Sequence, residues 1–231
     1  MDSTFEHIGM YNFMGIFGTG AINIVLWIMS YFITTDKNIF EFIEIINIKI
    51  ENYIWLTIFL FIILGYYVGT VLHELGRFLQ DYTKLFGEDI FESYFNDKKC
   101  TNTERKELLK FLKKDLTIKT FNFKDLSHDE IRFLYDYCNN YIKGTGKTIR
   151  NDRTQSIFGF SRGMFVGSLS HLFIYFICVV YYKIFNRWSI IITVFLGICV
   201  LLFFHRAKIY NVARVKNVFW MYYALRKGNV K

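Results

Sequence analysis

The stretch Asn52–Leu72 reads NYIWLTIFLFIILGYYVGTVL and contains no charged residue. A helix needs about 20 apolar residues to span the hydrocarbon core of a bilayer. Three further stretches without Asp, Glu, Lys or Arg have the same character: Ile8–Thr35, Gly163–Tyr182 and Ser189–Phe204. The sequence therefore predicts an all-α membrane protein whose four transmembrane helices form two hairpins, one on each side of a basic middle region.

The basic residues are concentrated on one predicted side of the membrane. Of the 28 Lys and Arg residues, 17 lie in residues 77–162 and 7 in residues 206–231. Cytoplasmic segments of membrane proteins carry an excess of Lys and Arg, so both termini and the middle region are expected to be cytoplasmic. The many Phe, Ile, Asn, Lys and Tyr residues are typical of AT-rich codons and indicate a low-GC bacterium. The expected location is the bacterial inner (plasma) membrane.

This organisation divides the chain into four predicted parts. They are an N-terminal transmembrane hairpin (1–74), a cytoplasmic helical domain (75–157), a C-terminal transmembrane hairpin (158–205) and a cytoplasmic helical tail (206–231). Within the domain, Ser127 and Glu130 fit a capping box, and apolar residues follow at helical spacing until Gly144. The net charge of +8 suits cytoplasmic loops that face anionic lipid better than it suits nucleic-acid binding.

Glycines recur at helical spacing on two of the predicted spans. Small residues allow helix backbones to approach closely, and helix association in lipid depends on such packing. This packing is expected either within one chain or between the subunits of a homo-oligomer. The glycines are Gly65, Gly69 and Gly76 on the second span, and Gly159, Gly163 and Gly167 on the third.

Three polar residues are predicted to lie at membrane depth: Asn23, Ser168 and His171. An ionisable side chain in a membrane usually faces a partner or a water-filled space. These residues are therefore candidates for a pore lining or a gate. The alternative is a neutral His171 that is hydrogen-bonded to a backbone carbonyl or to a nearby serine.

A cluster of cations precedes the third span and consists of Lys143, Lys147, Arg150 and Arg153. The segment Gly144–Thr148 (GTGKT), which contains Lys147, resembles a phosphate-binding loop. It lacks the first glycine of that motif, however, and follows a predicted helix rather than a strand. The cluster is expected either to contact lipid headgroups or to bind an anionic ligand such as a nucleotide or oligonucleotide.

A short motif at the end of the second predicted span resembles part of an enzyme signature. His73, Glu74 and Gly76 resemble the His-Glu-x-Gly-His motif of intramembrane site-2 metalloproteases, but Arg77 occupies the position of the second histidine. A guanidinium group cannot replace a zinc-binding imidazole. The sequence therefore predicts no enzyme, no catalytic residue, no metal and no cofactor.

In plan, the whole chain resembles the small four-helix membrane effectors of bacterial anti-phage defence systems, including the oligonucleotide-gated channels of the Hailong type. The resemblance rests on architecture and transfers no individual residue. It implies a homo-oligomeric pore that is opened by a nucleotide signal or a partner protein and depolarises the membrane. The alternative function is a non-conducting membrane scaffold that recruits a cytosolic partner through the middle region.

Overall fold

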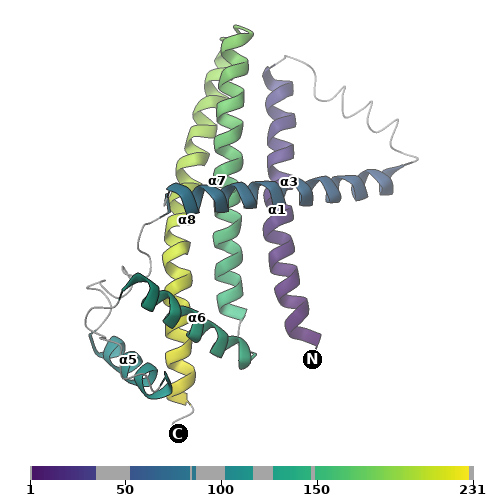
Figure 1. Ribbon diagram of the computed structural model, residues 1–231. Coiled ribbons are helices and arrows are strands. Elements are labelled where there is room, and N and C mark those ends of the chain that lie inside the picture. The colour runs from purple at the N-terminus through teal and green to yellow at the C-terminus, as the bar shows by residue number, and fades with distance from the viewer. Residues whose placement is uncertain are drawn as a thin grey trace. The chain divides into compact units, whose positions relative to one another are not determined.

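Figure 1 shows the computed structural model of the protein, which describes residues 2–34, 53–83, 85–86, 102–116, 127–146 and 149–228. The regular secondary structure within these ranges is entirely helical. Proline interrupts helices, and the chain contains none, so helices as long as 33 and 42 residues can form. The helices are α1 (Asp2–Thr34), α3 (Ile54–Thr83), α5 (Asn102–Leu116), α6 (His128–Gly144), α7 (Ile149–Tyr181) and α8 (Arg187–Gly228).

Four of these helices, α1, α3, α7 and α8, are long and apolar enough to cross a membrane. They also expose many large apolar side chains, among them Trp55, Phe173, Ile190 and Leu201. Apolar surface of this extent is typical of contact with lipid or with another protein. The predicted all-α class and the four apolar helices are thus confirmed for the described residues, whereas the arrangement as two membrane hairpins stays a prediction.

The chain folds into two compact units. The first comprises Met1–Ile8, Leu85–Gln155 and Lys208–Lys231, and the second comprises Gly9–Lys84 and Ser156–Ala207. The helices α1, α7 and α8 therefore contribute residues to both units. The predicted boundaries near residues 74, 157 and 205 fall inside α3, α7 and α8, where the helix continues without a break.

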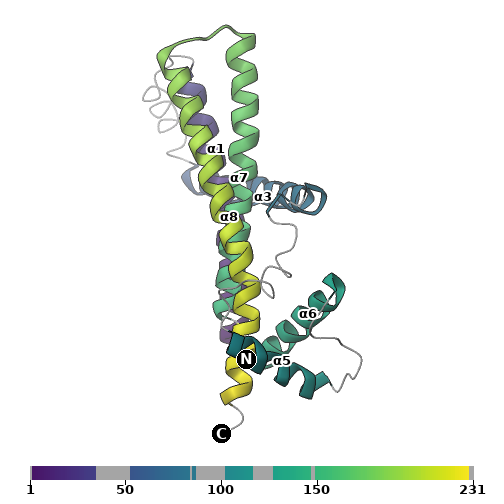
Figure 2. The ribbon, with the colours of Figure 1, turned by 90° about the vertical axis from the view of Figure 1, so that its left-hand side faces the viewer.

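In the first unit, α5 and α6 pack against the C-terminal part of α8 (Figure 2). The apolar residues recur every three or four positions on each helix, so each helix turns one apolar face to the others. The buried core is formed by Leu108 and Leu112 of α5, Ile131, Leu134, Cys138 and Ile142 of α6, and Val215, Val218, Phe219 and Tyr222 of α8.

The start of α6 has the predicted capping box. The Ser127 hydroxyl accepts a hydrogen bond from the Glu130 backbone N–H (3.3 Å), and the Glu130 carboxylate accepts one from the Ser127 backbone N–H (2.7 Å). The helix ends at Gly144, as its sequence predicts. The capping box fixes the start of α6, which supplies four residues to this core, as many as α8 does.

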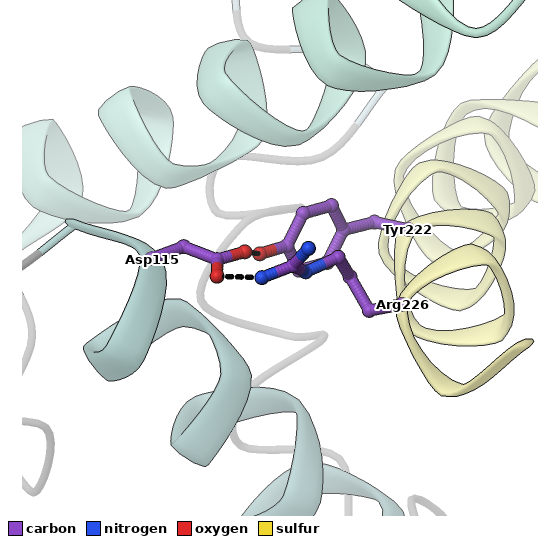
Figure 3. A network of polar contacts seen from close by, with 3 residues as sticks. All are labelled: Asp115, Tyr222 and Arg226. Carbon is purple, nitrogen blue, oxygen red and sulfur yellow. Dashed lines mark hydrogen bonds and ion pairs between the residues drawn. The ribbon is translucent and has the colours of Figure 1, made fainter. Parts of the chain in front are cut away.

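A polar network closes the edge of this core (Figure 3). The carboxylate of Asp115, on α5, accepts a hydrogen bond from the Tyr222 hydroxyl and forms an ion pair with Arg226. Tyr222 and Arg226 are four residues apart on α8, so their side chains leave the helix on the same face. The network therefore ties α5 to α8.

In the second unit, α1, α7 and α8 lie alongside one another, and α3 crosses α1 and α7 instead of running beside them (Figures 1 and 2). The short turn between α7 and α8 brings Tyr175 and Val179 against Ile192 and Leu196. The side chain of Asn186 accepts a hydrogen bond from the Ser189 backbone N–H (2.8 Å) and so caps the start of α8.

Candidate functional site

A seam of matched residues joins α1 to α7. Four residues of α1 lie four positions apart: Gly15, Thr19, Asn23 and Trp27. In that order, they contact four residues of α7: Ser156, Gly163, Gly167 and His171. Both residue numbers rise together, so the two helices run in the same direction. Positions four apart lie on one helix face, and small residues there allow the close approach typical of membrane helices. We call this set of eight residues the α1–α7 seam.

Asn23 lies at the centre of this seam and is almost fully buried. Its amide nitrogen donates to the backbone carbonyl of Thr19 (2.8 Å) and to the sulfur of Met164 (3.5 Å). A β-carbon on Gly167 would overlap the Asn23 amide, so glycine at position 167 is what makes room for this side chain. Among the described residues, the amide oxygen of Asn23 has no hydrogen-bond partner.

His171 lies one turn of α7 beyond Gly167 and is 1% exposed. Its imidazole stacks on the Trp27 indole, with ring centroids 4.6 Å apart and planes 13° apart. Tyr175 contacts the same imidazole edge-on, at a centroid distance of 6.2 Å. Within the described part of the chain, neither ring nitrogen of His171 has a hydrogen-bond partner, and the same holds for the hydroxyl of Ser168. Bonds from His171 to a backbone carbonyl or to Ser168 are thus not formed in this structure.

The third helix of the site, α3, packs its glycines against α1. Gly65 contacts Phe17 and Ala21, while Gly69 contacts the backbone of Ile16 and Gly20. At Gly69, and where Gly20 meets the carbonyl oxygen of Gly65, the two backbones touch without an intervening side chain. The predicted packing glycines of the second span therefore meet another helix of the same chain.

The C-terminal half of α3 packs against α7. The His73 imidazole lies against Gly159 and Gly163, where added β-carbons would be 2.7 Å and 3.1 Å from ring carbons. Gly76 contacts the aliphatic part of Arg162. The guanidinium group of Arg162 donates a hydrogen bond to Gln80 (2.8 Å) and lies over the ring of Phe158. All six predicted packing glycines are thus in contact within one chain.

The resemblance to the metalloprotease motif does not produce a metal site in the described residues. Glu74 and Arg77 form an exposed ion pair at 3.9 Å, and the neighbouring His73 ring is half-buried. No group of three or more His, Cys, Asp or Glu side chains in the described part of the chain could hold a metal ion.

The predicted cation cluster lies in the first unit, at the junction of α6 and α7. Lys143, Arg150 and Arg153 are exposed, and Lys147 lies outside the described residues. The Arg150 guanidinium is 4.8 Å from the centroid of the Trp220 ring. Nearby, the Asn151 amide donates to Asn139 (3.1 Å) and holds the start of α7 against α6.

The sequence did not single out Thr19, Trp27, Gly15 or Ser156 as site residues, and His73 was considered only as part of the metalloprotease motif. The signal for the first two was present, because they continue the four-residue spacing of Asn23 on α1. No spacing rule could have placed His73 against α7, since the crossing of α3 brings together residues that are far apart in the chain.

Comparison with known proteins gave no match: no family model, no curated protein and no solved structure shows significant similarity to this chain.

Proposed function

We propose that this protein is the subunit of a homo-oligomeric channel in the bacterial inner membrane and that the α1–α7 seam is its gate. The observation that carries the proposal is the burial of Asn23, Ser168 and His171 in helices apolar enough to span a membrane, with polar atoms that lack partners among the described residues. Polar groups are expensive in lipid and are retained mainly where they serve transport or signalling.

The proposed topology is two transmembrane hairpins with both termini in the cytoplasm, and it requires α3, which crosses α1 and α7 in this structure, to lie alongside them in the membrane. The strong asymmetry of Lys and Arg along the sequence supports this orientation. The shared direction of α1 and α7 also supports it, because both would enter the membrane from the cytoplasmic side. Membrane lipid is then the partner of the exposed apolar faces.

One subunit with four spans is too small to enclose a wide conduit, so conduction requires several copies around an axis. In the proposed closed state, the seam is tightly packed by Gly163 and Gly167. Opening would separate α1 from α7 and expose Asn23, Ser168 and His171 to water. Hydration would then supply the hydrogen bonds that these groups lack in the packed seam.

The proposed signal is an anionic molecule such as a nucleotide or oligonucleotide, bound by Lys143, Lys147, Arg150 and Arg153. Clustered Lys and Arg side chains bind phosphates well. A ligand shifts a conformational equilibrium only if it binds the two states differently. Because α7 carries both Arg150 and His171, movement of its first turn gives a direct route to the seam.

The test is ion flux through proteoliposomes and planar bilayers over a panel of mono-, di- and oligonucleotides. We expect a nucleotide-dependent current that is lost in the triple variant Lys143→Gln, Arg150→Gln, Arg153→Gln. The matched control is Lys110→Gln, Lys113→Gln, Lys114→Gln, which removes the same charge from exposed positions of α5. Absence of current under every condition, or equal loss in both triple variants, would count against the proposal.

The second candidate function is a non-conducting scaffold that recruits a cytosolic protein. It is favoured by one observation: the predicted packing glycines are all in contact within one chain, which leaves none of these contacts for neighbouring subunits. The scaffold predicts a monomer or dimer in nanodiscs, no flux, and loss of function when residues 101–143 are replaced. Particle mass and symmetry separate the two candidates, since the channel requires a ring of three or more subunits.

A further inference from the structure

A cavity of about 260 Å³ opens at the end of the second unit where α7 turns into α8. It is walled mainly by aromatic and aliphatic side chains from α1, α7 and the turn, and no charged residue lines it. The lining residues are Trp27, Ser30, Tyr31, His171, Ile174, Tyr175, Cys178, Tyr182 and Ile184. Ligand sites typically combine such an apolar wall with a few polar groups that orient the ligand.

Several side chains with polar atoms line this cavity, and among them His171 carries buried ring nitrogens without a partner in the described part of the chain. It is 1% exposed, and neither of its ring nitrogens has a hydrogen-bond partner among the described residues. The stacked Trp27 ring and the edge-on Tyr175 ring fix its orientation. A neutral imidazole offers one N–H donor and one acceptor nitrogen, so it can receive either a carbonyl or a hydroxyl group.

The size and shape of the cavity restrict the class of ligand. An apolar protein cavity of about 150 Å³ accommodates benzene, so about 260 Å³ leaves room for two fused rings. Aromatic walls favour a flat molecule that can stack or make edge-on contacts. The absence of charged lining residues argues against an ionic ligand, and the surrounding apolar helix surfaces favour a ligand that arrives through the membrane.

We propose that this cavity binds a flat, membrane-soluble aromatic molecule that bears a carbonyl or hydroxyl group, the class that includes naphthols and quinone headgroups, and that His171 forms the orienting hydrogen bond. The site shares His171 with the proposed gate but requires no conduction. Its test measures binding alone, so a failure of the channel proposal and a failure of this proposal can be told apart.

Two cysteines provide a matched probe. Cys178 lines the cavity, whereas Cys199, on α8, has similar partial exposure and is absent from the lining. Variants that retain only one of these cysteines, with Cys138→Ala and the remaining cysteines changed to serine, would be placed in nanodiscs. The rate of modification by N-ethylmaleimide would then be measured against increasing 2-naphthol, naphthalene and dodecane.

We expect saturating 2-naphthol to slow modification of Cys178 at least about fivefold and to leave Cys199 unchanged. Naphthalene lacks the hydroxyl group and should require about a five- to tenfold higher concentration for the same protection, because one hydrogen bond usually changes the binding affinity by about this factor. Equal slowing at both cysteines, or protection by dodecane as effective as that by 2-naphthol, would overturn the proposal. The latter result would assign the cavity to lipid acyl chains.

The variant His171→Phe tests the hydrogen bond itself. Phenylalanine preserves the ring that stacks on Trp27 and removes a buried imidazole without partners, so the protein should fold and melt at the same or a higher temperature. In this variant, 2-naphthol and naphthalene should protect Cys178 at nearly equal concentrations. A preference for 2-naphthol that survives the substitution would overturn the assignment of His171.

Discussion

Gly20 of α1 and Gly65 of α3 are in direct backbone contact: a β-carbon on Gly20 would overlap the carbonyl oxygen of Gly65. The crossing point of these helices therefore tolerates no side chain at position 20. Backbone atoms cannot rotate away as the end of a flexible side chain can, so any substitution must push the two helices apart.

We expect Gly20→Ala to destabilise the protein by about 1–3 kcal/mol, the usual cost of overpacking a closely packed interior. The matched control is Gly197→Ala on α8, where an added β-carbon meets no atom within 4 Å. Alanine has the higher helix propensity, so the control should be neutral or more stable by up to about 1 kcal/mol. Thermal unfolding in nanodiscs measures both variants. Equal melting temperatures would contradict the packed crossing.

The contact between Gly167 and Asn23 predicts coupling between their substitutions. Gly167→Ala alone forces the buried Asn23 amide out of its place, and Asn23→Ala alone creates a small void. In the double variant, the shorter side chain at position 23 makes room for the new methyl group. We expect the double variant to be more stable than the sum of the single effects predicts, by about 1 kcal/mol. Additive effects in a double-mutant cycle of unfolding free energies would show that the residues do not touch.

The Asp115 network predicts a ranking of three substitutions. Asp115→Ala leaves Arg226 and Tyr222 without their shared carboxylate and should cost about 3 kcal/mol, because Asp115 is 8% exposed. Tyr222→Phe removes one hydrogen bond and should cost about 1 kcal/mol. Glu74→Ala breaks only the exposed pair with Arg77 and should cost less than about 1 kcal/mol. Denaturant unfolding of the full chain checks the order, and a larger effect at Glu74 than at Asp115 would refute it.

Burial raises the pKa of the Cys138 thiol, and the nearby Asp115 carboxylate raises it further. Below pH about 8.5, the thiol is neutral in both the folded and the unfolded chain and does not affect the pH dependence of stability. Above that pH, the unfolded chain loses the proton first, so the folding free energy becomes less favourable as pH rises. The contribution of Cys138 to the slope of the unfolding free energy against pH should reach about 1.4 kcal/mol per pH unit.

Cys138→Ala should remove this part of the alkaline slope, which is measured as the difference between wild-type and variant unfolding free energies from pH 8 to pH 10. Burial also raises the pKa of Tyr135, but its ordinary pKa of about 10 places its effect at higher pH. Native Cys138 should accordingly react with N-ethylmaleimide only after unfolding. Rapid labelling in the folded protein, or an unchanged slope in Cys138→Ala, would disprove the assignment.

The helices themselves could be predicted because their signals are local. The uncharged run Asn52–Leu72 lies almost wholly within α3, and the pairing of Ser127 with Glu130 identified the start of α6. The tail predicted as helical (206–231) is likewise helical as far as Gly228, where α8 ends. The boundaries of the predicted domains have no such marker, since α3, α7 and α8 continue through them.

The candidate site could be predicted only in part. Polarity within apolar segments was enough to select Asn23, Ser168 and His171, but it could not identify their neighbours. The glycine spacing left open whether Gly163 and Gly167 pack within a chain or between chains, and the structure shows the contacts made within one chain. Three of the predicted cations lie exposed around the junction of α6 and α7, and what they bind stays a prediction.

The sequence by itself determined the helical class, the four membrane-length segments and the charge asymmetry, because these depend on composition and on spacing along a single helix. The tertiary structure decided which faces meet: Thr19 with Gly163, Trp27 with His171, and His73 with Gly159. Contacts of this kind depend on the direction and depth at which helices cross. Those quantities are set by the packing of many side chains at once, and no single segment encodes them.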